Sequence, residues 1–329
     1  LVLESSQTGT TIKYTLDGEL PNQNSPTYRR PIPINDSTEV RTRTFHSDLL
    51  PGPPTSETYI KLDPAITALR STLPLMVISR LGTQRISGSR NTPVHFSVFE
   101  PKGGKAYLLS DPDFAQRGAA KTRGSSTGSL AKSSWAIEWR DEFGEDENHS
   151  ILGMPSESEW VLYAPNNFDP IMIHNPFLHQ LSRDVGDYSP RTRFVEVYLN
   201  EGGPLDASQY EGIYVLEEKI SIGKNRVNID KLRPENVTLP EVSGGYLLKI
   251  DRPDPGDSGI TAMGTRVLWV DPKEDDIDTP RGSPNHPQEE FITNYLNLFH
   301  QASNSEQWRD PEIGYHAYIE TDQWINFHI

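Results

Sequence analysis

Residues suited to binding an anion stand together in one short stretch of the chain. Arg123, Gly124, Ser125 and Ser126 follow one another, and Lys132 comes shortly after them, close to the start of a predicted strand. Small residues let backbone N–H groups approach a phosphate closely, and a lysine can reach over such a loop. The Walker pattern GxxxxGK followed by Ser or Thr is absent, so this is not the loop of a P-loop NTPase. A solvated turn between two strands explains the same composition at least as often as a phosphate-binding loop does.

A carboxylate further along the chain is expected to face the interior. Alternation along the predicted strand Gly212–Ile220 puts Glu218 on the same side as Tyr214 and Leu216. An inward-facing carboxylate needs a cationic partner, because burying an unpaired charge is costly. We expect Lys132 to be that partner, on a facing strand and within salt-bridge distance. The alternative is an exposed strand end whose charges are solvated.

A third stretch, "SGGYLLKID", covers residues 243–251. Two glycines open a short apolar strand that begins at Tyr246 and ends in Lys249 and Asp251. By its composition alone this is an ordinary buried strand.

The elements that must position these residues follow a small N-terminal β-domain, predicted over residues 1–62. The stretch Thr11–Leu16 alternates with period two before the turn signal Asp17-Gly18, and Glu39–Phe45 alternates again. Prolines at 31, 33, 51, 53 and 54 exclude long helices. Several short strands with turn signals at this spacing predict a small all-β sandwich.

The rest of the chain is predicted to be an α+β domain over residues 75–329, after a linker at 63–74 that limited proteolysis should cut near 62–72. Strands are predicted at Leu75–Ile78, His95–Glu100, Ala106–Leu109, Ser134–Trp139, Phe194–Leu199, Gly212–Ile220 and Tyr246–Ile250. Helices are predicted at Ile171–Val185 and Pro287–Ala302, where apolar residues recur every three or four positions. Several strands, one helix, more strands and then helices indicate an α+β fold.

Composition excludes several classes of function. The chain has 31 basic and 46 acidic residues, and the net charge of −15 argues against non-specific binding of nucleic acid or anionic membranes. It has no cysteine, which excludes disulfides, thiolate metal sites and a cysteine nucleophile. No apolar run approaches the ~20 residues of a membrane helix, and no signal peptide is visible. The chain starts at Leu1 and stops at Ile329 within an apolar-periodic stretch, so we expect it to be a fragment.

The N-terminal stretch "IKYTLDGELPNQNSPTYRRPIPINDSTEVRTRTF" resembles the chitobiase/β-hexosaminidase C-terminal domain, an Ig-like module of secreted bacterial proteins. The similar positions are "YTLDG", a following proline, a serine, tyrosine and "PIPI" stretch, and the alternating strand that ends in Phe45. The resemblance implies a spacer or adhesion module and does not imply sugar cleavage.

Residues from about 75 to 329 resemble the CotH kinase family, atypical protein kinases with a kinase-like fold. The similar motifs, in order, are "RGSS" followed by Lys132 and an aromatic strand, "LGMPSESEWVLYAPNNFDPIMIHNPFLHQL", "VEVYLN", "YEGIYVLEEKI", "NRVNI", "GGYLLKID" and "GYHAYIETDQWINFHI". Known members phosphorylate serines on surface or spore-coat proteins. The resemblance therefore implies ATP with Mg²⁺ or Mn²⁺ as cofactors, a protein substrate with Ser or Thr, surface or coat proteins as partners, and an extracellular or cell-surface location.

The resemblance also implies roles for the residues singled out above. Lys132 would contact the phosphates of ATP, and Glu218 would orient Lys132, as a Lys–Glu pair does in kinases. The loop 123–126 would bind phosphate, and the stretch 246–251 would line the adenine site.

The sequence departs from the family pattern at several points. Lys132 is followed by Ser133 where the family often has two lysines, and His174-Asn175 stands where Arg-Asn is usual. In the family, a catalytic loop with Asn and Asp and then a metal-binding Asp follow the segment that matches residues 314–329. We therefore expect the metal ligands beyond residue 329, and we expect the chain by itself to hold only the nucleotide-binding part and to transfer no phosphate.

Two other functions stay open on the sequence. The chain could be a kinase-like surface protein without activity, which binds partners and uses its N-terminal domain as a spacer. A polysaccharide-active enzyme is suggested only by the N-terminal resemblance, and it would need two carboxylates ~5–10 Å apart in a sugar-sized cleft.

Overall fold

The computed structural model describes residues 1–80, 85–88, 90–124, 127–166, 169–253, 256–273 and 286–328. The chain divides into two compact units. The first comprises Leu1–Pro176 and Arg191–Glu218, and the second comprises Phe177–Pro190 and Lys219–Ile329. Strands dominate the first unit, and the helices α2 and α3 belong to the second.

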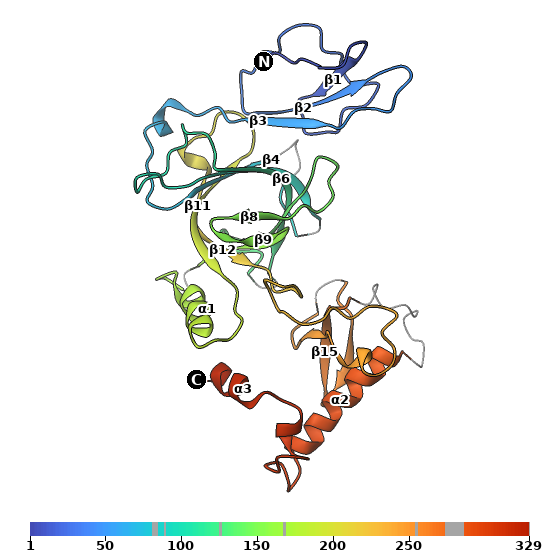
Figure 1. Ribbon diagram of the computed structural model, residues 1–329. Helices are drawn as coiled ribbons and strands as arrows, with labels where there is room; N and C mark the ends of the chain where they lie inside the picture. The colour runs from blue at the N-terminus through green and yellow to red at the C-terminus, as the bar shows by residue number, and fades with distance from the viewer. Residues whose placement is uncertain are drawn as a thin grey trace. The chain divides into compact units, whose positions relative to one another are not determined.

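The N-terminal region is a three-stranded antiparallel sheet, called here the N-terminal module (residues 1–62). Its strands β1 (Thr11–Thr15), β2 (Thr38–Phe45) and β3 (Thr55–Tyr59) lie in the order β1-β2-β3 (Figure 1). A small β-domain is confirmed, but within the described residues it has one sheet and not the two sheets of a sandwich. The proline-rich stretch between β1 and β2 explains this difference, because proline has no N–H to donate to a second ladder.

The centre of the first unit is a closed barrel of seven strands, in the order β10-β12-β11-β4-β5-β6-β7. Strands β11 and β4 run parallel, and the other neighbours are antiparallel. The strands are β4 (Leu75–Arg80), β5 (Thr92–Phe99), β6 (Phe114–Arg123), β7 (Ser134–Trp139), β10 (Glu159–Tyr163), β11 (Thr192–Asn200) and β12 (Tyr210–Glu218). Closure leaves no exposed edge strand, so the backbone groups of this sheet are paired within the barrel.

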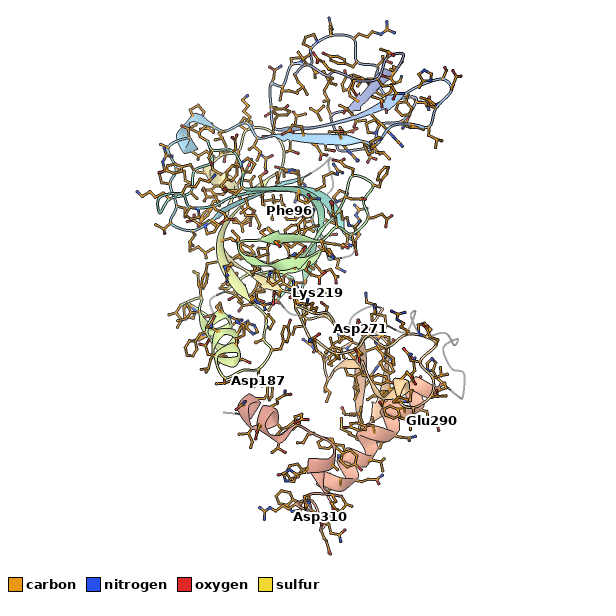
Figure 2. All side chains as sticks on the ribbon, in the orientation of Figure 1. Phe96, Asp187, Lys219, Asp271, Glu290 and Asp310 are labelled. Atoms are coloured by element: carbon orange, nitrogen blue, oxygen red, sulfur yellow. The ribbon has the colours of Figure 1, made fainter. Side chains whose placement is uncertain are left out.

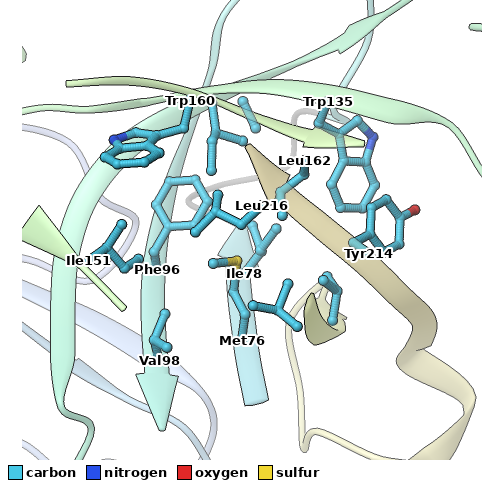
Figure 3. Close-up of a cluster of buried hydrophobic side chains, with 14 of the residues drawn as sticks. Met76, Ile78, Phe96, Val98, Trp135, Ile151, Trp160, Leu162, Tyr214 and Leu216 are labelled. Atoms are coloured by element: carbon cyan, nitrogen blue, oxygen red, sulfur yellow. The ribbon is translucent and has the colours of Figure 1, made fainter. Parts of the chain in front are cut away.

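Alternate side chains of every barrel strand fill its interior. Phe96 lies inside the barrel (Figure 2), and it contacts the ring of Trp139 edge-on with 4.7 Å between ring centroids. Trp135 stacks on Tyr214 with 5.3 Å between the ring centroids, and Figure 3 shows the two rings side by side. The hairpin of β8 (His149–Ile151) and β9 (Met154–Glu157) adds Ile151 to the same core. The outward faces of these strands therefore remain for the N-terminal module, the connecting segments and a functional site.

The segment predicted as a linker packs against the outside of the barrel. It contains a short 3₁₀ helix (Pro64–Ile66), and Ile66 is buried with Leu75, Phe99 and Leu205. The predicted strand Ala106–Leu109 is not a strand, because Ala106 forms only an isolated bridge to Ser71 and its side chain joins this outer cluster.

The second unit combines a small antiparallel sheet with helices. The sheet has the order β13-β15-β14, from β13 (Leu247–Lys249), β14 (Gly259–Ala262) and β15 (Thr265–Asp271). Helix α2 (Pro287–Ser303) packs its buried Ile292 against this sheet, and α3 (Thr321–His328) follows. Helix α1 (His174–Asp184) begins in the first unit and continues in the second. The described part of the chain is mostly β with few helices, which agrees in part with the expected α+β class.

Candidate functional site

The predicted phosphate loop connects β6 to β7. Arg123 is the last residue of β6, and Gly124 has a φ of +102°, which favours glycine. A Cβ at Gly124 would lie 2.3 Å from the Thr127 hydroxyl oxygen, and a Cβ at Gly128 would lie 2.4 Å from the Gly124 carbonyl oxygen. The loop therefore needs both glycines for its close turn. Ser125 and Ser126 lie outside the described residues.

Lys132 is half-buried just before β7, where it binds neutral groups. Its Nζ donates to the carbonyl oxygens of Ile213 at 2.5 Å and Pro165 at 3.3 Å, and it lies 4.8 Å from the centre of the Tyr214 ring. Burial lowers the pKa of Lys132, and the charge of Glu211 partly offsets that effect. Lys132 makes no ion pair with any residue in the described part of the chain.

Glu218 faces the interior, as the strand alternation predicts, but its partner is Arg191. Glu218 as a whole residue is 2% exposed. Its Oε1 lies 2.8 Å from Nη1 of Arg191, and its Oε2 accepts a hydrogen bond from the Arg191 backbone N–H at 3.0 Å. The expected Lys132–Glu218 pair is therefore wrong for this structure.

The geometry of β12 explains why Lys132 does not meet Glu218. Lys132 contacts Ile213 near the start of β12, whereas Glu218 is the last residue of that strand. At about 3.3 Å per residue, roughly 16 Å separate these two positions along the strand. The alternation of side chains identified the correct face of β12 but carried no information about which end of the barrel Lys132 occupies.

Sequence reasoning missed Arg191, although a signal was present. Strands β11 and β12 pair antiparallel with Thr192 opposite Glu217, so the residue before β11 lies beside the end of β12. Pairing the two predicted strands as an antiparallel hairpin would have placed the cation of Arg191 next to Glu218.

The three residues predicted for the adenine site belong to the second unit. The Tyr246 hydroxyl donates to the carbonyl oxygens of Val242 at 2.9 Å and Gln288 at 3.1 Å, so it helps to hold α2. Lys249 forms an ion pair with Asp257 at 2.7 Å, and Asp251 is exposed. These contacts give Tyr246 a packing role within its unit, and the adenine contacts stay a prediction.

The outer face of the barrel carries a row of neighbouring residues that the sequence did not reveal. Lys121, Ala136, Val161 and Glu217 are paired in register across β6, β7, β10 and β12, and we call them the outer-face row. Glu217 is the unusual member, because its Oε1 is buried without a hydrogen-bond partner. An unsatisfied buried oxygen calls for a specific explanation.

Burial raises the pKa of Glu217 to about 7, and the cation of Arg123 lowers it only in part. The hydroxyl of Tyr163 also has a raised pKa, first through burial and then through the charges of Asp169 and Glu217. The last residue of β6 and the end of β12 are therefore electrostatically linked across this face. A ligand that bound there would meet cations at one end and a carboxyl group at the other.

Neither a metal site nor a membrane helix emerges from the described residues. No group of three or more His, Asp or Glu side chains among them is placed to hold a metal ion. The helices within the described ranges are too short or too polar to cross a bilayer.

A comparison with protein-family models gives the family of most of the chain. The model of the CotH kinase protein family matches residues 120–329. The chain belongs to the CotH kinase protein family. The match begins at the end of β6, so it includes the loop before β7, Lys132 and Glu218 of this CotH-family chain.

The N-terminal module matches a second family. Residues 1–57 match the chitobiase/beta-hexosaminidase C-terminal domain. A comparison with curated proteins gives no significant match.

Strands β4 and β5 of the CotH-family chain precede the matched residues, yet they close the same barrel.

Proposed function

We propose that this CotH-family chain provides the nucleotide-binding part of an ATP-dependent kinase that phosphorylates Ser or Thr on secreted or surface proteins. The observation that carries the proposal is the β6–β7 loop, a tight glycine turn flanked by Arg123 and Lys132. Among the described residues Lys132 contacts neutral groups, so a phosphate would offer it a stronger, charge-assisted hydrogen bond. Membership of the CotH kinase protein family supports phosphate binding as the role of this loop.

The chain's own residues would act by binding and orienting the nucleotide. Phosphoryl transfer relies on positioning and on neutralising charge that develops on the transferred group. Arg123, Lys132 and the backbone N–H groups of the loop would bind the phosphates. A divalent metal, Mg²⁺ or Mn²⁺, would supply the remaining positive charge, but the described residues offer no ligand cluster that fits it.

Transfer of labelled phosphate from ATP by the natural full-length protein tests the proposal. We expect Lys132→Ala and Arg123→Ala each to lower the rate by about a hundredfold or more, because each removes a charge aimed at the phosphates. Lys105→Ala is the matched control, since Lys105 is exposed and distant in sequence from the loop. A wild-type rate in Lys132→Ala, with its thermal midpoint unchanged, would refute the role of Lys132.

The alternative function is a kinase-like surface protein that binds partners without transferring phosphate. The Glu218–Arg191 pair favours it, because that glutamate is already neutralised and does not orient Lys132. The same assay separates the two functions. A full-length protein that binds ATP but never transfers its phosphate would support the binding protein.

A further inference from the structure

The N-terminal module meets the barrel through a largely buried network of charges, of which Glu142 is the most exposed member. The network consists of Glu39 and Arg41 on β2, Arg117 on β6 and Glu142 in the turn after β7. Glu39 and Arg41 are 5% and 4% exposed, values that are rare for charged residues. Two cations and two anions face one another, so the network has no net charge.

Arg41 makes four contacts and joins both sides of this interface. Its Nε donates to the Ser56 hydroxyl at 3.1 Å, and its Nη1 donates to the Gly18 carbonyl at 3.1 Å, both within the module. Its Nη2 lies 3.1 Å from the Glu142 carboxylate and also donates to the Glu142 carbonyl. Ser56 completes the junction by donating to the Glu142 carboxylate at 2.6 Å.

Arg117 makes the reciprocal contact from the barrel side. Its guanidinium donates to the Glu39 carboxylate and, at 3.4 Å, to the carbonyl of Gly18. His95 lies opposite Arg117 in the register of β5 and β6. Burial and the neighbouring Arg117 lower the pKa of His95 to about 3, so His95 adds no charge to the network at neutral pH.

Burial raises the pKa of Glu39 despite its two arginine neighbours, and burial lowers the pKa of Arg41. Desolvation therefore offsets much of the attraction within the network. A buried ion network of this kind adds little net stability as a whole, but losing one member leaves the others buried and unpaired. Its effect is to specify one docked arrangement.

The segment that leaves the module forms a second set of contacts between the module and the barrel, and these contacts restrict bending between the two. The Asp63 N–H donates to the Leu205 carbonyl at 2.8 Å, and the Leu205 N–H donates to the Lys61 carbonyl at 2.7 Å. The side chains of Leu62 and Leu69 pack on the apolar cluster outside the barrel. A free linker would have neither backbone pairing nor buried side chains.

We propose that the N-terminal module is a permanently docked part of the kinase-like barrel, and that the two open and unfold as one cooperative unit. The surface formed by Arg117 and Glu142 is thus an interaction surface whose partner is the face of β2 and β3 that carries Glu39, Arg41 and Ser56. This assignment replaces the role of a flexible spacer. It does not depend on ATP binding, because the contacts that carry it involve none of the residues proposed to bind ATP.

The docking also reaches the candidate site through a shared strand. Arg117 and Arg123 belong to the same strand β6, and Arg123 opens the phosphate loop. The module therefore contacts the first half of β6, and the last residue of the same strand leads into the phosphate loop.

Hydrogen exchange of backbone amides in the intact chain tests this proposal, with β2 and the barrel strands β5 and β6 followed separately. We expect Arg41→Met to lower the protection of both groups by the same factor, about tenfold or more, because it breaks a buried charge network that both share. If Arg41→Met does not fold, Glu142→Gln provides the same comparison with a milder change.

Lys13→Met is the matched control, because in the part of the chain that the structure describes the Lys13 ammonium group bonds to Thr27, inside the module. We expect Lys13→Met to leave the protection of β5 and β6 at the wild-type level, in contrast to the loss expected in Arg41→Met. Loss of protection confined to the module in Arg41→Met or Glu142→Gln, with β5 and β6 as in the wild type, would overturn the proposal. The double variant Arg41→Met/Glu142→Gln should lose less protection than the product of the factors lost in the two single variants, since both changes remove the same contact.

Discussion

Glu217 is a carboxyl group whose charge is costly in the folded chain. Its pKa rises from 4.5 to about 7 through burial, so the folded chain binds this proton more tightly than the unfolded chain. The associated stability is fully present below pH ~4.5 and is lost as the pH rises through ~7. We expect Glu217→Gln, which stays neutral, to raise the free energy of unfolding at pH 8 by at most about 3 kcal/mol.

Urea unfolding of both proteins at pH 5 and pH 8 measures this effect. The two should differ little at pH 5, where the wild-type carboxyl is largely protonated, and should diverge at pH 8. Glu306→Gln is the control, because Glu306 is exposed on the second unit. Equal stabilities of Glu217→Gln and the wild type at pH 8 would contradict a buried, unsatisfied carboxylate.

The side chains of the candidate site show what alternation predicts and what it omits. Period-two patterning correctly turned Glu218 inward, because side-chain direction is a local property of a strand. Its partner depends on which strands pair and in what register, which is a long-range property. Glu217 escaped notice for the same reason, since only the closed sheet shows that it shares a row with Lys121.

At the scale of elements, the barrel depends on one close approach between β6 and β7. A Cβ at Gly118 would lie 2.2 Å from the Glu138 carbonyl oxygen and 2.8 Å from Cε2 of Phe96. We expect Gly118→Ala to destabilise the first unit by about 3 kcal/mol, because both neighbours belong to packed strands that cannot move aside cheaply.

Calorimetric unfolding of the variant checks this expectation. Gly244→Ala is the matched control, because no atom lies within 4 Å of a Cβ at that position and its φ is −118°. We expect the control to be neutral or slightly stabilising. An unchanged thermal midpoint in Gly118→Ala would contradict the close approach of Gly118 on β6 to the Glu138 carbonyl oxygen on β7.

Sequence patterns predicted five of the seven barrel strands, all but β6 and β10, and they did not reveal the barrel itself. The strand β7 was predicted at its observed bounds, because Trp135, Ile137 and Trp139 alternate with polar or small residues. Strand β6 was missed, because "FAQRGAAKTR" is rich in residues with low β-propensity. Its small residues are needed for close approach inside a closed sheet, and closure is not visible in any single segment. Helix α2 of the second unit was predicted within one residue of its observed end, since its apolar period is strong.

At the scale of the whole molecule, acidic residues outnumber basic ones by 46 to 31. The resulting net charge of −15 gives the chain a negative potential, which attracts cations and repels anions. Under the proposed function, this potential favours protein substrates whose acceptor serine is flanked by lysine or arginine. The effect belongs to the summed charge and not to any single residue, so it persists through most individual substitutions.

Phosphorylation of two serine peptides by the natural full-length protein tests this preference, one peptide flanked by lysines and the other by glutamates. We expect the basic peptide to have the lower KM, by about tenfold at ~0.1 M salt, because the screening length there is still about 10 Å. At ~1 M salt the screening length falls to about 3 Å, and the two KM values should converge. The kcat values should stay similar, since long-range attraction acts on encounter and not on the chemical step. Equal KM values at low salt, or a preference that does not respond to salt, would assign substrate choice to local contacts instead of the net charge.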